Sequence, residues 1–181
     1  MEVEKELSDS VFYSPTKGQM TFEEVIEEIV AIMAKEPQKR YEIVVGTDCH
    51  DTPIGEKKSP KSEQLGSQPP VMDFVSAIII HRIGKGARYF WRRSREEDIY
   101  TLREKIYREA YLSFELAQAI MRELQRRTML DFNLEIHVDV GERGRTRELI
   151  DEVVGYIRAS GFAVKTKPDS YGASTVADKH A

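Results

Sequence analysis

Hydrophobic residues recur at two spacings along this chain, and the spacings predict alternating helices and strands. Thr21 is followed three residues later by Glu24, which is a capping box, and apolar positions then recur at helical spacing until Pro37. Residues 41–48 are rich in β-branched side chains and stop at a polar cluster, which is typical of a strand. The pattern therefore predicts an N-terminal helix over residues 21–36 and a first strand over residues 41–48.

The middle of the chain predicts a hairpin that follows a long polar segment. Residues 51–70 are rich in Pro, Ser, Lys, Gly and Gln and almost free of apolar residues, so we expect a mobile loop there. Residues 74–83 and 87–92 have strand patterns, and Gly84-Lys85-Gly86 between them favours a tight turn. Together with the first strand, the hairpin would form an antiparallel meander.

The C-terminal half alternates between helical and strand patterns. A long helix is predicted from about residue 99 to residue 127 by one stripe of Leu102, Ile106, Ser113, Leu116, Ala117, Ile120 and Leu124. The later patterns predict a strand over 134–140, a helix over 146–159, a strand over 162–166 and a short helix capped by Ser170 or Ser174. The expected fold is an α/β mixed five-stranded sheet, an antiparallel meander plus parallel strands, flanked by helices, with an extra N-terminal helix.

Composition narrows the class of protein. With 181 residues, 40% of them hydrophobic, the chain suits one well-buried core, so we expect a single domain over residues 1–181. The net charge of −4 names neither nucleic acid nor membrane as the partner. A lone cysteine, the lack of a secretory signal and the lack of a long apolar run predict a soluble cytoplasmic protein that does not enter a membrane.

Two aspartates mark the carboxyl ends of predicted strands. Asp48 ends the first strand, and Asp139 lies near the end of the strand that follows the long helix. If these strands are parallel neighbours, both carboxylates emerge at one edge of the sheet, where open α/β sheets place their sites. Two close carboxylates repel each other and normally need a cation or a shared proton, and Mg²⁺ or Mn²⁺ suits them. Each Asp taken alone could equally end a strand and begin a turn.

The long helix offers three glutamates, and its helical phase selects one of them. Glu109 falls in register with the apolar stripe, whereas Glu104 and Glu115 lie nearer its margins. An inward carboxylate is costly to bury without a partner, and a metal ion is one such partner. The alternative is a partly exposed Glu109 that pairs with Arg103 or Arg108.

The C-terminus supplies a further acid and a histidine. Asp178 lies in an amphipathic turn that could aim its carboxylate at the same sheet edge, whereas Asp169 fits a turn cap after Pro168. His180 could transfer a proton or orient substrate near a metal site, or it could simply belong to a frayed terminus. Asp178 is therefore the preferred fourth acid, and His180 is a candidate catalytic residue.

Four stretches of sequence carry a resemblance to known proteins. They are Val45-Gly-Thr-Asp48, Leu102-Arg-Glu-Lys-Ile106, His137-Val-Asp-Val-Gly141 and Lys167-Pro-Asp-Ser-Tyr-Gly-Ala-Ser-Thr-Val-Ala-Asp-Lys-His180. Together they resemble the YkuK-type family of uncharacterised ribonuclease H-like proteins over nearly the whole chain, and the C-terminal stretch is the most specific. One departure is Cys49-His50, where the family commonly has Ser-Gln, so substrate contacts at these two positions are not carried over.

The resemblance implies the ribonuclease H-like fold and its metal chemistry. In that fold, acids on the first strand, the first core helix, the fourth strand and the last helix bind two Mg²⁺ or Mn²⁺ ions. By position these acids are Asp48, Glu109, Asp139 and Asp178. Two such ions activate water and stabilise the leaving oxygen in phosphodiester hydrolysis. The expected function is a divalent-metal-dependent nuclease that acts on RNA, DNA or a hybrid.

Basic residues gather in the predicted hairpin, where residues 74–95 hold no acidic side chain. A phosphate backbone would bind such a cluster, and bases would stack on its aromatics, although Tyr89, Phe90 and Trp91 fit packing on the core better. The segment 141–146 opens a helix but lacks the spacing and the Lys of a P-loop. The expected nucleic-acid contacts are Arg82, Lys85, Arg88, Arg92, Arg93, Arg95, Arg143 and Arg145.

Two other functions stay open on the sequence alone. A non-catalytic nucleic-acid-binding or scaffold protein would keep the fold without turnover, and a phosphatase would act on small phosphate esters. The presence of all four acids favours an enzyme over a scaffold. The absence of an Asp-x-Asp-x-Thr signature disfavours the phosphatase.

Overall fold

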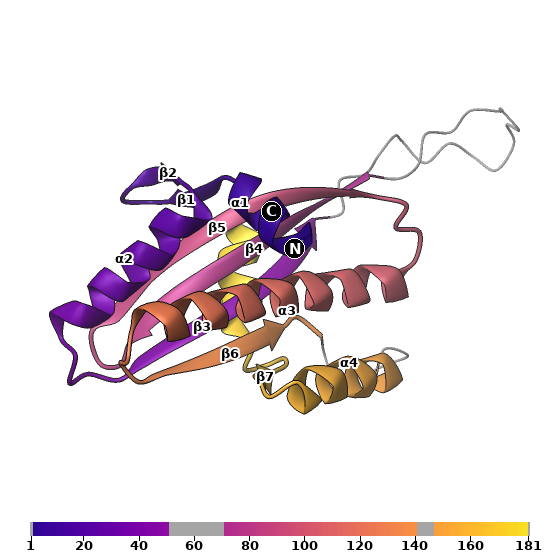
Figure 1. The fold of residues 1–181 in the computed structure, drawn as a ribbon. Coiled ribbons are helices and arrows are strands. Elements are labelled where there is room, and N and C mark those ends of the chain that lie inside the picture. Colours follow the sequence, from indigo (N-terminus) through magenta and orange to yellow (C-terminus); the bar gives the residue numbers. More distant parts are fainter. Residues whose placement is uncertain (1, 51–70, 141–146, 181) are drawn as a thin grey trace, which may run out of the picture.

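A mixed sheet forms the centre of the structure, a computed structural model that describes residues 2–50, 71–140 and 147–180. Its seven strands lie in the order β2-β1-β5-β4-β3-β6-β7 (Figure 1). The strands are β1 (Phe12–Ser14), β2 (Gly18–Met20), β3 (Tyr41–His50), β4 (Val71–Arg82), β5 (Gly86–Glu97), β6 (Phe132–Val138) and β7 (Ala163–Lys165). The helices are α1 (Glu2–Asp9), α2 (Phe22–Lys35), α3 (Leu102–Arg127), α4 (Arg147–Ala159), the π-helix η1 (Gly172–Ala177) and α5 (Asp178–His180).

The predicted mixed sheet is confirmed, but it has seven strands where the sequence predicted five. The two additional strands, β1 and β2, form a short antiparallel hairpin whose first strand pairs with the edge of β5. Each is only three residues long, too short to show the alternation by which a strand is recognised. Helix α1, which precedes them, was not predicted either.

The register of the central strands fixes the geometry of the carboxyl edge. β3, β4 and β5 form the predicted antiparallel meander, and β3 pairs in parallel with β6 from Tyr41↔Phe132 to Thr47↔Val138. β6 in turn pairs in parallel with β7. Since β3 and β6 run in the same direction as neighbours, the residues that follow Thr47 and Val138 lie at the same end of the sheet, where β6 stops and β3 continues to His50 in its pairing with β4.

Capping boxes fix where the two long helices begin. At α2, the Thr21 hydroxyl accepts the N–H of Glu24 at 3.2 Å, and Glu24 Oε2 accepts the N–H of Thr21 at 2.7 Å, as predicted. α3 has a second box, formed by Thr101 and Glu104. This box starts α3 at Leu102, three residues later than the apolar pattern predicted.

The two faces of the sheet are covered unequally. Helices α1, α2, α3 and α4 pack over one face and enclose the main apolar core, to which β3 contributes Ile43 and Val45. The short η1 segment lies on the other face, behind β3 and β4 in Figure 1, and its Ala177 packs with Val75 and Ala77. The C-terminal segment and α3 therefore approach β3 from opposite sides.

Two predicted features lie outside the described residues, namely the loop over 51–70 and the segment 141–146 with Arg143 and Arg145. Within the described ranges, no helix has the length and apolar character needed to cross a membrane.

Candidate active site

The carboxyl ends of β3 and β6 bring two aspartates together. Asp48 and Asp139 directly follow the last pair of the parallel register, Thr47↔Val138. Burial is the main cause that raises the pKa of Asp48, and the charge of Asp139 acts in the same direction. The backbone N–H of Cys49 donates to Asp48 Oδ1 at 2.9 Å, which acts in the opposite direction. The sequence predicted that Asp48 and Asp139 lie at the same edge if their strands are parallel neighbours. The structure has these strands as parallel neighbours.

Glu109 reaches the same edge from α3. Its side chain is 4% exposed, and its Oε1 is buried without a hydrogen-bond partner. Burial raises the pKa of Glu109 to about 8; Asp48 and Asp139 reinforce that shift, while Lys105 opposes it. The inward orientation predicted from the helical phase is confirmed. At neutral pH this carboxyl group is thus largely protonated unless a cation stabilises its charged form.

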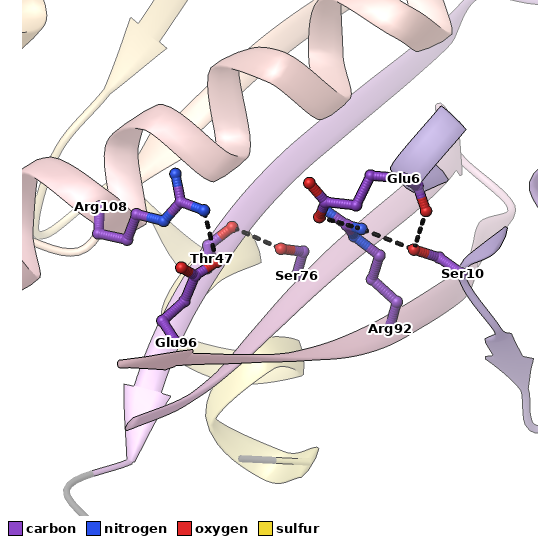
Figure 2. Close-up of polar contacts among 7 residues, drawn as sticks. All are labelled: Glu6, Ser10, Thr47, Ser76, Arg92, Glu96 and Arg108. Carbon is purple, nitrogen blue, oxygen red and sulfur yellow. Dashed lines mark hydrogen bonds and ion pairs between the residues drawn. The ribbon is translucent and has the colours of Figure 1, made fainter. Parts of the chain in front are cut away.

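The arginines that could have neutralised Glu109 have other partners. Arg108 forms an ion pair with Glu96 on β5 (Figure 2), and Arg103 lies 3.5 Å from Glu152 on α4. The alternative in which Glu109 is a partly exposed member of a surface ion pair is therefore wrong.

The other two glutamates of α3 have different surroundings. Glu104 is exposed, belongs to the capping box and accepts the N–H groups of Tyr100 and Thr101, both at 2.8 Å. Glu115 is half-buried, and its charge acts on Arg92 and Tyr111. Neither is among the groups that shift the pKa of Asp48 or Glu109.

Asp178 approaches from the opposite face of the sheet. It is the first residue of α5, directly after η1, which packs on β3 and β4. Its charge contributes to the raised pKa of Asp48, so the two carboxylates lie within electrostatic reach. Asp169, by contrast, is exposed in a turn, where its N–H donates to the carbonyl of Thr166 at 2.8 Å. The charges of Asp139 and Asp178 act on Asp48, and that of Asp48 acts on Glu109, so the other three acids named from the sequence lie within electrostatic reach of Asp48.

Two lysines that the sequence did not single out face these acids. Lys167 Nζ lies 2.9 Å from Asp139 Oδ1, an ion pair without hydrogen-bond geometry, so Oδ1 still lacks a hydrogen-bond partner. Lys105 lies one turn before Glu109 on α3 and lowers the pKa of both Asp48 and Glu109. The i to i+4 spacing could have identified Lys105, whereas no local signal places Lys167 beside Asp139.

The donor atoms at this edge suit a hard cation. Carboxylate oxygens are the ligands that Mg²⁺ and Mn²⁺ prefer, and two of the oxygens here, on Glu109 and Asp139, are buried without hydrogen bonds. Across the described part of the chain, no group of three or more His, Cys, Asp or Glu side chains is placed to hold a metal ion. Like charges repel, so the carboxylates would have to draw together around a cation that offsets their repulsion.

His180 lies on the aromatic surface of β5. Its ring stacks on Trp91 with centroids 4.4 Å apart, its Nε2 is 3.2 Å from the Tyr89 hydroxyl, and its carbonyl accepts a 2.5 Å hydrogen bond from Arg93. The ring therefore anchors the last turn of the chain to β5. Of the three hairpin aromatics, Phe90 is buried in the main core, while Tyr89 and Trp91 take part in this stack.

Acids from distant segments pair with most of the basic hairpin residues. Arg92 is 3% exposed and is held by Glu6 and Ser10 beneath α1 (Figure 2). The other ion pairs are Arg82 and Lys85 with Glu36, Arg88 with Glu28, and Arg95 with Asp73. The nucleic-acid contacts expected from this hairpin remain predictions.

A chain of hydroxyl groups beneath the site was also missed. Thr47 Oγ1 lies 2.9 Å from Ser76 Oγ (Figure 2), and Ser113 Oγ donates to Thr47 Oγ1 at 2.9 Å. All three side chains are buried, and they link β4, β3 and α3 through Thr47, the residue that precedes Asp48. The polar residue in the apolar stripe of α3, Ser113, was the available signal.

Comparison with known proteins agrees with this architecture. Residues 65–181 match the family Ribonuclease H-like. The chain is 33% identical over 188 residues to the uncharacterized protein YkuK of Bacillus subtilis (strain 168), a match that covers 96% of this chain and 98% of that protein. No solved structure matches. The family match and this relative together show that the chain belongs to the YkuK-type family of ribonuclease H-like proteins.

Proposed function

We propose that this protein is a divalent-metal-dependent nuclease that hydrolyses phosphodiester bonds in RNA, DNA or a hybrid. The observation that carries the proposal is the Glu109 carboxyl group, which is buried beside Asp48 and Asp139 with one oxygen unpartnered. A fold retains so costly a group where a ligand compensates for it, and perturbed carboxylates of this kind gather at functional sites. The ribonuclease H-like fold supports nucleic acid as the substrate.

Four segments of the fold would hold the site. Asp48, Glu109 and Asp139 would hold Mg²⁺ or Mn²⁺, with Asp178 joining from the η1 face. Two such ions, if bound there, would supply activation of water and stabilisation of the leaving oxygen of a phosphodiester. The parallel register of β3 and β6 sets the two aspartates side by side, and the Cys49 N–H orients Asp48.

The first test is binding of the metal. We expect Mn²⁺ at ten times its Kd to stabilise the protein by about 1.4 kcal/mol, which raises the Tm by roughly 3–5 °C for a chain of this size. Asp48→Asn should abolish the shift. Glu104→Gln is the matched control, because Gln also completes a capping box and Glu104 lies outside the acidic cluster. An unchanged Tm of the wild type across millimolar Mn²⁺ would contradict the metal site.

The second test is cleavage of labelled single-stranded RNA, duplex DNA and RNA–DNA hybrid in Mn²⁺. Glu109→Gln should lower the rate by roughly 100-fold or more, since loss of even an outer-shell partner of a metal commonly costs 10- to 100-fold. Glu115→Gln, two turns further along the same helix, should leave the rate nearly unchanged. If the wild type binds Mn²⁺ and nucleic acid but cleaves none of the three, the non-catalytic function replaces this proposal.

A further inference from the structure

Lys167 lies beside Asp139, at the solvent-exposed side of the candidate site. Its Nζ is 2.9 Å from Asp139 Oδ1, and its side chain is 50% exposed where that of Asp139 is 15% exposed. The backbone N–H of Lys167 donates to the carbonyl of Val140 at 3.2 Å, which fixes the segment after β7 beside the end of β6. The backbone is thus anchored next to Asp139, while the ammonium group is exposed enough to move.

We propose that Lys167 is an exchangeable counter-ion and a phosphate-binding residue of this site. Its ammonium neutralises Asp139 in the metal-free protein and transfers to a phosphate of the nucleic acid when a divalent cation takes that carboxylate. This inference rests on the proposed function. It assigns to the chain a binding residue that couples metal binding to substrate binding.

The electrostatics of the ion pair support an exchange. A divalent cation and an ammonium group at one carboxylate repel each other, so the more weakly bound of the two moves away. A half-exposed lysine pair contributes little to stability, and its long flexible stem reorients readily. The ammonium has three donors and no acceptor, so a displaced Lys167 is free to bind another anion, and the phosphodiester is the anion that the proposed reaction brings to this edge.

Lys165 shows why Lys167 in particular is exchangeable. Lys165 Nζ lies 2.6 Å from Glu135 and 3.7 Å from Glu42, so two carboxylates hold it. Neither of them belongs to the candidate metal site. Among the described residues, the carboxylate that pairs with Lys167 is that of Asp139, which is a candidate metal ligand. Two lysines on the same short segment thus have opposite expected behaviour, and each serves as the control for the other.

The test begins with Mn²⁺ calorimetry on the full-length chain without nucleic acid. Lys167→Met removes the competing charge, so we expect it to bind Mn²⁺ roughly three- to tenfold more tightly than the wild type. Lys165→Met and Lys167→Arg should stay within about twofold of the wild type, because both keep a cation beside Asp139. Lys167→Gln provides the same measurement if Lys167→Met does not fold.

The second arm measures binding of a fluorescent RNA–DNA hybrid whose phosphorothioate linkages resist cleavage, with Mn²⁺ present. Lys167→Met should weaken this binding and lower the slope of log affinity against log salt by about one, the value for one lost phosphate contact. Lys165→Met should keep the slope of the wild type. The two arms predict opposite effects of one substitution, with tighter metal binding and weaker nucleic-acid binding.

The possible failures are distinguishable. If Mn²⁺ binding depends on Asp48 but Lys167→Met binds the metal no more tightly, or keeps the salt slope of the wild type, the role of Lys167 is wrong and the nuclease proposal stands. If the wild type binds no Mn²⁺, the proposed function fails and this inference fails with it.

Discussion

Arg92 and Glu109 are buried to nearly the same extent, 3% and 4% exposed, yet their surroundings are opposite in kind. Arg92 Nη1 donates to Ser10 Oγ at 2.9 Å and lies 3.4 Å from Glu6 Oε1 (Figure 2). Its Nε makes no hydrogen bond, but Nη1 has both a charged and a neutral partner. Glu109 instead shares its surroundings with two further carboxylates. A buried charge with its own counter-charge serves the fold, whereas one placed among like charges indicates a binding site.

The causes of the pKa shifts of Arg92 and Glu109 also differ in the sign of the neighbouring charges. Burial lowers the pKa of Arg92 and raises that of Glu109, which in both cases favours the neutral form. Glu6 then acts against burial at Arg92, while Asp48 and Asp139 act with burial at Glu109. Lys105 and the Cys49 N–H oppose the shift at Glu109, and the pKa still rises to about 8.

The largest expected effect on stability comes from removing Arg92, the buried charge that has its own counter-charge. Arg92→Ala removes a buried side chain and its link to α1, so the free energy of unfolding should fall by about 2–4 kcal/mol in urea titrations. Arg88→Ala is the matched control, because Arg88 lies on the same strand, its side chain is half-exposed, and its partner Glu28 also pairs with Lys17. That control should change stability by less than about 1 kcal/mol. A loss at Arg92 as small as that of the control would refute its structural role.

The next effect is a pH dependence that belongs to Glu109. Its folded pKa of about 8 lies above the ordinary value of 4.5, so between these values the native state holds more protons than the unfolded state. Stability from this group is therefore complete below about pH 4.5 and is lost as the pH rises toward 8. In the metal-free protein the loss should approach about 1.4 kcal/mol per pH unit.

Comparing the pH dependence of stability between each variant and the wild type isolates the contribution of Glu109 from those of other titrating groups. Glu109→Gln should remove the slope between pH 5 and pH 8 and make the metal-free protein more stable than the wild type at pH 8. Glu115→Gln should keep the slope, because Glu115 does not act on the acidic cluster. Parallel stability curves for the wild type and Glu109→Gln would show that the carboxyl group is not desolvated in solution.

The fold and the acidic cluster were largely predictable because their signals are local. Residues rich in β-branched side chains and a glycine turn gave the meander, and the helical phase placed Glu109 inward from residues within two turns of it. The convergence of Asp48 and Asp139 needed only the assumption of parallel neighbours, which the register confirms. The boundary of α3 was missed although its signal was equally local, since Thr101 and Glu104 repeat the capping box that was recognised at α2.

The counter-charges were not predictable because they come from distant segments. Residues 74–95 hold no acid, which favoured a basic surface, yet Glu6 pairs with Arg92 across 86 positions of sequence. The ion pair between Lys167 and Asp139 likewise joins two segments that only the tertiary fold brings together. A short stretch of sequence therefore shows where the charged residues are. Whether each charge has a partner depends on the tertiary fold.

The smallest expected effect concerns the hydroxyl chain behind the site. Ser113 Oγ lies 2.9 Å from both Thr47 Oγ1 and the Glu109 carbonyl, but its single hydrogen serves one acceptor at a time. Ser113→Ala leaves Thr47 with Ser76 as a remaining hydroxyl partner, so the free energy of unfolding should fall by only about 1 kcal/mol.

Metal affinity decides whether this hydroxyl chain belongs to the fold or to the site. If it only joins α3 to the sheet, Ser113→Ala should keep the Kd for Mn²⁺ within about twofold of the wild type while lowering the Tm by roughly 2–4 °C. A weakening of Mn²⁺ binding by more than about fivefold, at a temperature where the variant is fully folded, would mean that the chain positions Glu109 relative to Asp48. Ser76→Ala is the control that separates a role in the fold from a role in positioning Glu109. It removes a hydroxyl group of the same chain on β4 without altering α3.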